Sequence, residues 1–167
     1  MPNTPIQQEI RQNKPFQTPA HEAAVSLLRT ANLLVRHYTN VVEQHGITLQ
    51  QYNVLRILRG AGPDGLPTLE VGERMVEQTP GITRLLDRLE KRGYVMRRRG
   101  ADDRRQVFCH ITEDGLTVLQ QLDQPVNEAD VSGLSGLDVA ALPDFTRMLG
   151  DVRGGLHRLL DGEGENN

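Results

Sequence analysis

Two helical patterns that follow each other almost without a linker limit the fold of this chain more than any other feature. Thr68 is placed to cap a short helix, LEVGERMV, and a second helical pattern ends at Gly93. Thr79 is a good N-cap for the second helix, and Pro80 suits its first helical position. One apolar stripe of the second helix consists of Ile82, Leu85, Leu86 and Leu89. Only residues 77–79 separate the two helices, and so short a turn is typical of a helix-turn-helix.

Two short β-prone runs come directly after this pair of helices. They are YVMRRR and RQVFCHI, and they flank GADDR, whose Gly and Asp residues favour a turn. In the second run Val107, Cys109 and Ile111 alternate onto one face, which leaves Phe108 and His110 on the other. The sequence therefore predicts a β-hairpin, and a helix-turn-helix followed by a hairpin has the outline of a winged helix.

The remaining apolar periods predict four further helices. A long amphipathic helix occupies residues 20–46, and Thr48 with Gln51 forms a capping box for the next helix. Thr112 caps a fifth helix, which Pro125 bends or breaks. The last helix carries a coiled-coil seam that requires another helix, made of Leu142, Phe145, Leu149, Val152, Leu156 and Leu159. The expected fold class is mainly α, an α+β winged helix with six helices and a two-stranded hairpin.

The ends of the chain and its composition exclude several classes of protein. Residues 1–19 contain four prolines and many Gln and Asn, so we expect a flexible arm there, and residues 162–167 are expected to form a loose tail. No apolar run approaches the ~18 residues of a membrane span, and the first residues lack the pattern of a secretory signal. The single cysteine cannot form an internal disulfide, so we expect a cytoplasmic protein without a membrane partner.

Positive charge is concentrated in one stretch of the chain. The formal net charge of the whole chain is −3, yet residues 84–105 carry nine basic and four acidic side chains, a local net charge of +5. Residues 1–83 are neutral and residues 106–167 carry a net charge of −8. Because the basic stretch coincides with the second helix and the hairpin, we expect that surface to bind an anionic partner, and duplex DNA fits both elements.

The exposed faces of the helix and the hairpin supply the candidate DNA contacts. The first turns of a helix in the major groove reach base edges and phosphates, and a wing tip places arginine at the minor groove. Arg105 is the first choice for that minor-groove insertion, with Asp103 orienting its guanidinium or bracing the turn. The candidate helix residues are Thr79, Pro80, Gly81, Thr83, Arg84, Asp87, Arg88 and Lys91. The candidate wing residues are Arg97, Arg98, Arg99, Asp103, Arg104 and Arg105.

Some charged residues of this stretch have an alternative role in ion pairs. Asp87 either accepts a hydrogen bond from a cytosine or, as the simpler interpretation, holds Arg84 or Arg88 in place. Arg92 and Arg97 have the alternative of pairing with Glu90 or Asp102. The sequence leaves these alternatives open.

The same stretch resembles the MarR family of bacterial transcription regulators. The family pattern is a recognition helix with a leucine, a short charged run and a glycine, then a hydrophobic pair, a basic strand, Asp-x-Arg at the wing and Leu-Thr-x-x-Gly before the next helix. The matching segment here is TPGITRLLDRLEKRGYVMRRRGADDRRQVFCHITEDG, with Asp103-Arg104-Arg105 at the wing and Ile111-Thr112-Glu113-Asp114-Gly115 after it. The resemblance is dense across residues 68–115, and the order of helices extends it to residues 21–160.

This resemblance implies an assembly and a mode of regulation. It implies a single domain at residues 20–161, with a DNA-binding lobe at about residues 48–113 and dimerisation helices at about residues 20–46 and 114–161. The implied regulator is a homodimer that binds palindromic operators. Of the two roles, repressor or activator, repressor is the one expected. The resemblance further implies that a small molecule, often phenolic or aromatic, or an oxidant lowers DNA affinity, with a pocket near Tyr38, Tyr52 and Arg56. Pro143, which falls inside the expected last helix, departs from the family pattern.

Other functions find less support in the sequence. Cys109 shares a strand face with apolar residues, so we expect a buried small side chain rather than an oxidant sensor. The five histidines lack the spacing of a metal site, and we expect neither a metal nor a cofactor. No phosphate loop, nucleophile elbow or pair of catalytic carboxylates is present, so we do not expect an enzyme. The alternative to a DNA-binding regulator is a winged-helix module whose basic face binds protein partners.

Overall fold

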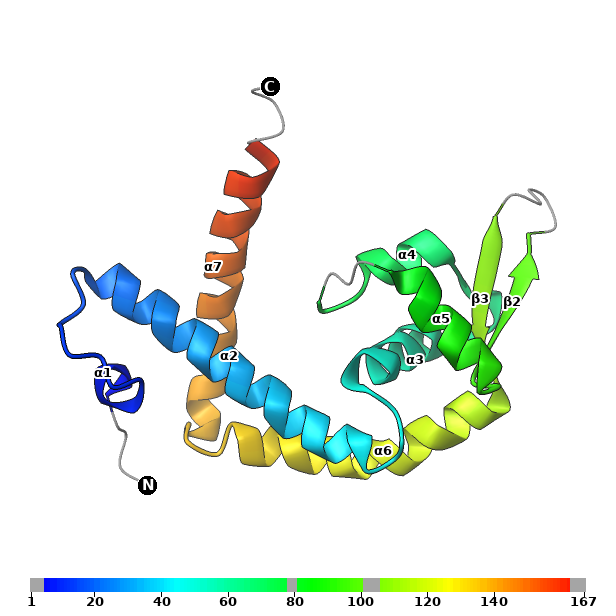
Figure 1. Cartoon of the computed structure of the whole chain (residues 1–167), viewed down its shortest axis with the longest axis horizontal. Helices are drawn as coiled ribbons and strands as arrows, with labels where there is room; N and C mark the ends of the chain where they lie inside the picture. The colour runs from blue at the N-terminus through cyan, green and yellow to red at the C-terminus, as the bar shows by residue number, and fades with distance from the viewer. Residues whose placement is uncertain (1–4, 78–80, 101–105, 163–167) are drawn as a thin grey trace. The chain divides into compact units, whose positions relative to one another are not determined.

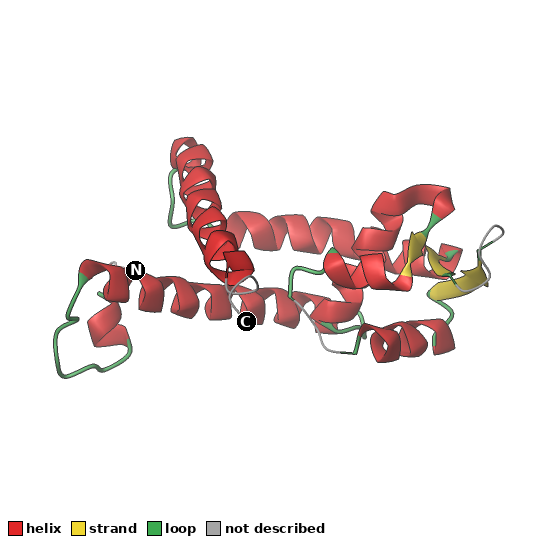
Figure 2. Cartoon of the chain, turned by 90° about the horizontal axis from the view of Figure 1, so that it is seen from above, coloured by secondary structure: helices red, strands yellow, loops and turns green. Residues whose placement is uncertain are grey.

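The computed structural model of the chain describes residues 5–77, 81–100 and 106–162. It forms two compact units, residues 1–129 and residues 130–167. Figure 1 labels the helices and strands, and Figure 2 shows that helices dominate the chain. The elements are α1 (Ile6–Glu9), α2 (Pro19–Glu43), α3 (Leu49–Ala61), a 3-10 turn (Gly62–Asp64), β1 (Leu66–Pro67), α4 (Thr68–Glu73), α5 (Ile82–Lys91), β2 (Val95–Arg99), β3 (Val107–Ile111), α6 (Glu113–Gly133), a second 3-10 turn (Val139–Ala141) and α7 (Leu142–Gly162).

Side-chain caps set the starts of helices α2, α3 and α6. The Thr18 hydroxyl accepts a hydrogen bond from the His21 amide at the start of α2. At the start of α3 Thr48 and Gln51 form the predicted capping box, with both reciprocal hydrogen bonds present. The Thr112 hydroxyl accepts from the Gly115 amide at 3.2 Å, which confirms Thr112 as the cap of α6. These boundaries depend on local hydrogen bonds, and they agree with the sequence prediction.

The sheet has three antiparallel strands in the order β1-β3-β2. The long pair β2 and β3 is the predicted hairpin, and Arg97 lies opposite Cys109 in its register. The third strand, β1, pairs Leu66 with Cys109 and Pro67 with Phe108. The expectation of a two-stranded hairpin was therefore incomplete. A strand of two residues shows no alternating pattern, so nothing in its own sequence reveals its pairing.

One apolar core holds the lobe of residues 48–113 together. It combines the buried faces of α3 and α5 with Val95 of β2, Cys109 of β3 and three side chains of α6. Cys109 is fully buried, as the alternation of its strand predicted. Gly115 lets α6 approach the sheet, because a Cβ there would collide with the Tyr94 carbonyl and lie 2.8 Å from the Ile111 side chain. The α6 side chains of the core are Leu119, Leu122 and Val126.

Several details of the predicted helices were wrong. We expected six helices, whereas the described residues contain seven, because Ile6–Glu9 form α1 inside the expected arm. The Arg29 guanidinium pairs with the Glu9 carboxylate of α1 at 2.7 Å. Of the two expected effects of Pro125, a bend or a break, the break is absent, because Pro125 lies within α6. A proline removes one backbone donor, and the buried side chains on both sides of Pro125 hold the helix against the core.

Thr68 was expected to cap the short helix of the pair, but the structure gives it another role. It is the first residue of α4, and no side chain caps that helix. The Thr68 hydroxyl instead lies 3.5 Å from the Val107 carbonyl and 3.5 Å from the Cys109 sulfur. Thr68 thereby links α4 to β3 rather than closing the helix end.

The second unit consists mainly of the 21-residue helix α7. Pro143 is the second residue of α7, so it lies in the first turn, where a missing amide hydrogen costs little. The expected conflict between Pro143 and the helix is therefore absent. Among its described residues α7 has no buried side chain. None of the described helices is long and apolar enough to span a membrane.

Candidate nucleic-acid interface

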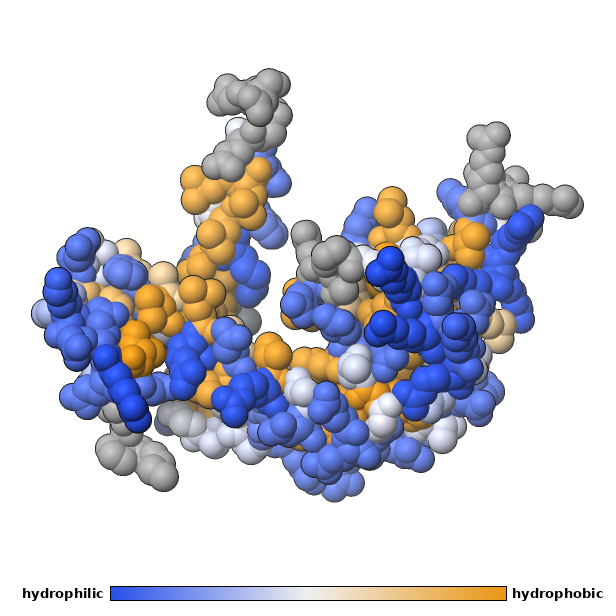
Figure 3. All heavy atoms as spheres, viewed as in Figure 1, coloured by the Kyte–Doolittle hydropathy of each residue, from blue (hydrophilic) through white to orange (hydrophobic). Residues whose placement is uncertain are grey.

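Helix α5 presents one buried face and one basic face. Leu85, Leu86 and Leu89 are buried in the core, as the stripe in the sequence predicted. The other face is exposed and carries Thr83, Arg84, Arg88 and Lys91. The side chains of Arg84, Arg88 and Lys91 form no hydrogen bond or ion pair with any other residue that the structure describes. Figure 3 shows hydrophilic side chains gathered over this part of the molecule.

The start of α5 differs from the expected one. Gly81 is the N-cap residue, with a φ of +102°, and the helix begins at Ile82. We had placed Gly81 on the face of the helix, after a cap at Thr79 and a first turn at Pro80. Thr79 and Pro80 lie outside the described residues. The positive φ explains why a glycine occupies this position, since other residues rarely adopt this conformation.

Strands β2 and β3 and the segment that joins them form the wing, which follows α5 in the chain. Arg98 and Arg99 are exposed at the outer end of β2. The Gly100 amide donates to the Gln106 carbonyl at 2.9 Å, which closes the base of the hairpin. Asp103, Arg104 and Arg105, the remaining candidate wing residues, lie outside the described residues. The exposed arginines of β2 therefore extend the basic face of α5 along the wing.

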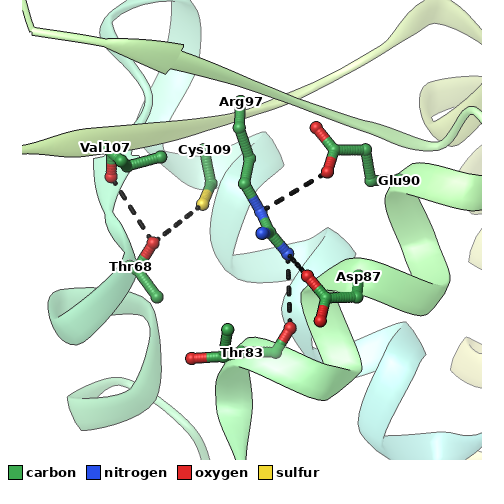
Figure 4. A network of polar contacts seen from close by, with 7 residues as sticks. All are labelled: Thr68, Thr83, Asp87, Glu90, Arg97, Val107 and Cys109. Atoms are coloured by element: carbon green, nitrogen blue, oxygen red, sulfur yellow. Dashed lines mark hydrogen bonds and ion pairs between the residues drawn. The ribbon is translucent and has the colours of Figure 1, made fainter.

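Arg97 does not share the exposure of its two neighbours on β2. Its side chain is only 20% exposed and points back to α5 (Figure 4). One guanidinium nitrogen, Nη2, donates to Asp87 Oδ1 at 2.5 Å and to the Thr83 carbonyl at 3.2 Å. Arg97 Nε lies 3.8 Å from Glu90 Oε2. Of the open alternatives for Arg97, the ion pair with Glu90 is present, whereas Asp102 lies outside the described residues. Asp87 is a further partner that we did not anticipate.

The contact with Arg97 gives Asp87 a partner that we did not predict, and a hydrogen bond from a cytosine to Asp87 stays a prediction. We expected Asp87 to hold Arg84 or Arg88, but its partner is on the wing. The period of a strand could have indicated this arrangement, because Arg97 lies two residues after the buried Val95 and shares its face. What the sequence could not supply is the distance between β2 and α5.

Arg92 is a second basic residue whose side chain contacts other parts of the chain. It donates to the Gly46 carbonyl and to the Tyr94 hydroxyl, at 3.2 Å for the latter. The expected pair with Glu90 is not among its contacts in the described part of the chain, and Asp102 lies outside that part. No sequence pattern pointed to Gly46, which is 46 residues away.

The three residues suggested for a ligand pocket lie on α2 and α3. Tyr52 is buried, and the Arg56 guanidinium lies 5.9 Å from the centre of its ring. Burial raises the pKa of the Tyr52 hydroxyl, and Arg56 partly opposes that rise. Tyr38 is partly buried and packs against the same core. The structure thus brings Tyr52 and Arg56 together and places Tyr38 on the core, which leaves their ligand role a prediction.

The residues suggested for dimerisation lie along α7. Leu142, Phe145 and Leu149 are partly exposed. The exposed fractions rise to 46% for Val152, 50% for Leu156 and 67% for Leu159. Within its own unit α7 therefore leaves an apolar seam uncovered.

Comparison with known proteins agrees with this geometry. The model of the MarR family matches residues 47–107. A crystal structure of a MarR transcription factor from Planctomyces limnophilus is 34% identical, with a TM-score of 0.63, and the match covers 81% of this chain and 98% of that one. The homoprotocatechuate degradative operon repressor of Escherichia coli is 25% identical over 63% of this chain and 70% of its own length.

A third relative is similar in fold. It is BpsR of Bordetella bronchiseptica, a protein whose DNA binding is regulated by 6-hydroxynicotinic acid. The TM-score is 0.70 at 20% identity, and the match covers 79% of this chain and 98% of that one.

Proposed function

The chain belongs to the MarR family of DNA-binding transcription regulators, and we propose that it is a repressor that binds palindromic operators as a homodimer. We propose further that a small aromatic molecule releases it from DNA. The observation that carries the proposal is the basic face of α5, where Arg84, Arg88 and Lys91 are exposed without partners in the described chain.

The geometry of α5 and the wing suits two grooves of one duplex. A helix fits the major groove, where arginine makes two hydrogen bonds to a guanine edge. Arg84 lies in the first turn of α5, which is the part that reaches base edges in this mode of docking. Arg98 and Arg99 continue the basic surface toward the wing tip. We assign Arg84 and Arg88 to the bases, Lys91, Arg98 and Arg99 to phosphates, and Arg105 to the minor groove.

The seam of α7 supports the homodimer. Val152 and Leu156 are half-exposed, so burying them against another helix would stabilise α7. A second copy of the chain offers an identical seam for that purpose. Leu156→Glu is expected to convert the dimer to monomers in light scattering. Arg158→Glu, which places the same side chain on the opposite face of α7, is the control and should leave the mass unchanged. A monomeric wild-type protein would contradict this part of the proposal.

The proposed release by a small molecule has two supports. Tyr52 and Arg56 combine an aromatic ring with a cation, which suits an aromatic acid. BpsR, which shares the fold, is regulated in its DNA binding by such an acid. Phenols and aromatic carboxylic acids should be screened for loss of DNA affinity. If none of them acts, the effector belongs to another class.

The experiment that tests DNA recognition is selection of bound fragments from random duplex DNA. The proposal predicts a palindromic consensus whose half-sites are spaced by about one turn, roughly 10 base pairs. A promoter that contains this consensus should be transcribed less when the protein is added. If selection enriches no sequence, the result supports the alternative that the sequence left open, in which the basic face binds a protein.

A further inference from the structure

We infer that Arg97 is a positioning residue of the DNA-binding surface, which ties the wing to α5 and neutralises two carboxylates there without itself contacting DNA. The inference rests on the proposed DNA contacts of α5 and the wing. It removes one of the six candidate wing residues from the DNA contacts and gives it a different task.

The contacts of Arg97 hold two of its three guanidinium nitrogens, Nη2 and Nε, against α5, where a phosphate cannot use them. Its Nη2 serves both Asp87 and the Thr83 carbonyl, and its Nε is buried beside Glu90 (Figure 4). The three partners lie on successive turns of α5, at positions 83, 87 and 90, so they share one face of the helix. The guanidinium therefore contacts one side of α5 along about two turns.

The charges on α5 explain why this arrangement matters for DNA. The side chains of Asp87 and Glu90 are 48% and 43% exposed, and they lie on the same short helix as Arg84 and Arg88. Unpaired carboxylates at that position would repel the phosphates of a duplex. The Arg97 guanidinium supplies a compensating charge to both of them.

The contact also fixes geometry. Arg98, next on β2, is exposed and available to phosphate, whereas Arg97 holds the same strand to the helix that enters the groove. Because the helix and the wing must engage one duplex together, their fixed spacing lowers the cost of binding. Arg97 thus acts through Asp87 rather than on DNA.

A double-mutant cycle with Asp87 separates this role from a phosphate contact. Arg97→Met is expected to weaken binding to a selected duplex by about tenfold, which is about 1.4 kcal/mol. In an Asp87→Asn background, where one unpaired carboxylate is gone, the same change should cost about threefold or less. The slope of log affinity against log salt should stay as in wild type. Arg97→Lys, which keeps a cation beside Asp87, should recover most of the affinity.

Arg98→Met is the matched control on the same strand. As a phosphate contact it should lower the salt slope by about 0.9, and its cost should be equal in both backgrounds. If Arg97→Met behaves as Arg98→Met does, or leaves affinity unchanged, the positioning role is wrong.

A second cycle measures unfolding without DNA, so that a failure of the contact can be told from a failure of the proposed function. Arg97→Met should lower the unfolding midpoint by about 2–4 °C, and adding Asp87→Asn should lower it no further. Additive losses of stability would overturn the contact itself. If the losses of stability are coupled but the protein selects no duplex, the contact between Arg97 and Asp87 is supported. The DNA-binding proposal, on which the positioning role of Arg97 depends, is then rejected.

Discussion

The guanidinium of Arg92 donates a hydrogen bond to the backbone carbonyl of Gly46, with 2.5 Å between Nη1 and the oxygen. Arg92 is the C-cap residue of α5, and Gly46, with a φ of +74°, lies in the turn between α2 and α3. The Tyr94 ring lies 4.8 Å from the same guanidinium. The end of α5 is therefore tied to the turn that leads out of α2.

Arg92→Met should loosen this connection without removing a DNA contact. A charge-assisted hydrogen bond at an exposed site is worth at most about 1 kcal/mol, so the unfolding midpoint should fall by no more than about 2–4 °C. The salt dependence of DNA binding should not change, because Arg92 faces Gly46 rather than the phosphates. Arg88→Met is the control. It should lower DNA affinity and leave the unfolding midpoint unchanged. A reduced salt slope for Arg92→Met would show that Arg92 contacts DNA.

Arg84→Ala should relax sequence preference at one base pair. Arginine that reads a guanine edge discriminates by about 1–3 kcal/mol, so the penalty for a mismatch at that pair should fall by this amount. The measurement is affinity for a set of duplexes that each carry one substitution. Lys91→Ala, from the last turn of α5, is the comparison and should weaken all duplexes alike. Uniform weakening by Arg84→Ala would instead make Arg84 a phosphate contact.

Gly115→Ala should destabilise the lobe, because the added Cβ collides with the Tyr94 carbonyl and the Ile111 side chain. Overpacking of this kind costs about 1–3 kcal/mol of unfolding free energy, measurable by urea titration. Gly136→Ala, whose Cβ would meet nothing within 4 Å, is the matched control. Surface changes of that type stay within about 0.5 kcal/mol. Equal stability of both variants would contradict the close approach of α6 to Tyr94.

Tyr52 predicts how stability responds to alkaline pH. Burial raises its pKa above the usual 10.0, so the folded state holds the phenolic proton at a pH where the unfolded state has lost it. The stabilisation is complete below pH 10.0 and is lost as the pH rises through the folded-state pKa. Above pH 10.0 the wild type should therefore lose unfolding free energy more steeply than Tyr52→Phe. Parallel curves for the two proteins would show that Tyr52 does not contribute.

The parts of the fold that depend on local chemistry were predictable from the sequence. The capping box of Thr48 and Gln51, the Thr112 cap and the buried Cys109 each depend on residues within a few positions of one another. The pairing of β1 with β3 joins residues 66 and 109 and leaves no local trace. The sequence therefore predicted a hairpin and missed the third strand.

The candidate site shows the same limit at the level of side chains. The exposed basic face of α5 followed from its apolar stripe, since helical geometry places Arg84 and Arg88 opposite the leucines. The partners of Arg92 and Arg97 depend on how α5 packs against a turn and a strand distant in sequence. Charge alone marked both as candidates for DNA or ion pairs, and only the packing distinguishes them.

The most direct test of DNA binding through α5 compares two charge-matched double variants on the selected duplex. Arg84→Ala with Arg88→Ala removes the basic face of α5, whereas Arg36→Ala with Arg147→Ala removes two exposed arginines from α2 and α7. We predict that the first variant loses at least about a hundredfold in affinity, or about 2.7 kcal/mol, while the second binds as wild type does. Equal losses in the two variants, or wild-type binding by the first, would contradict the account.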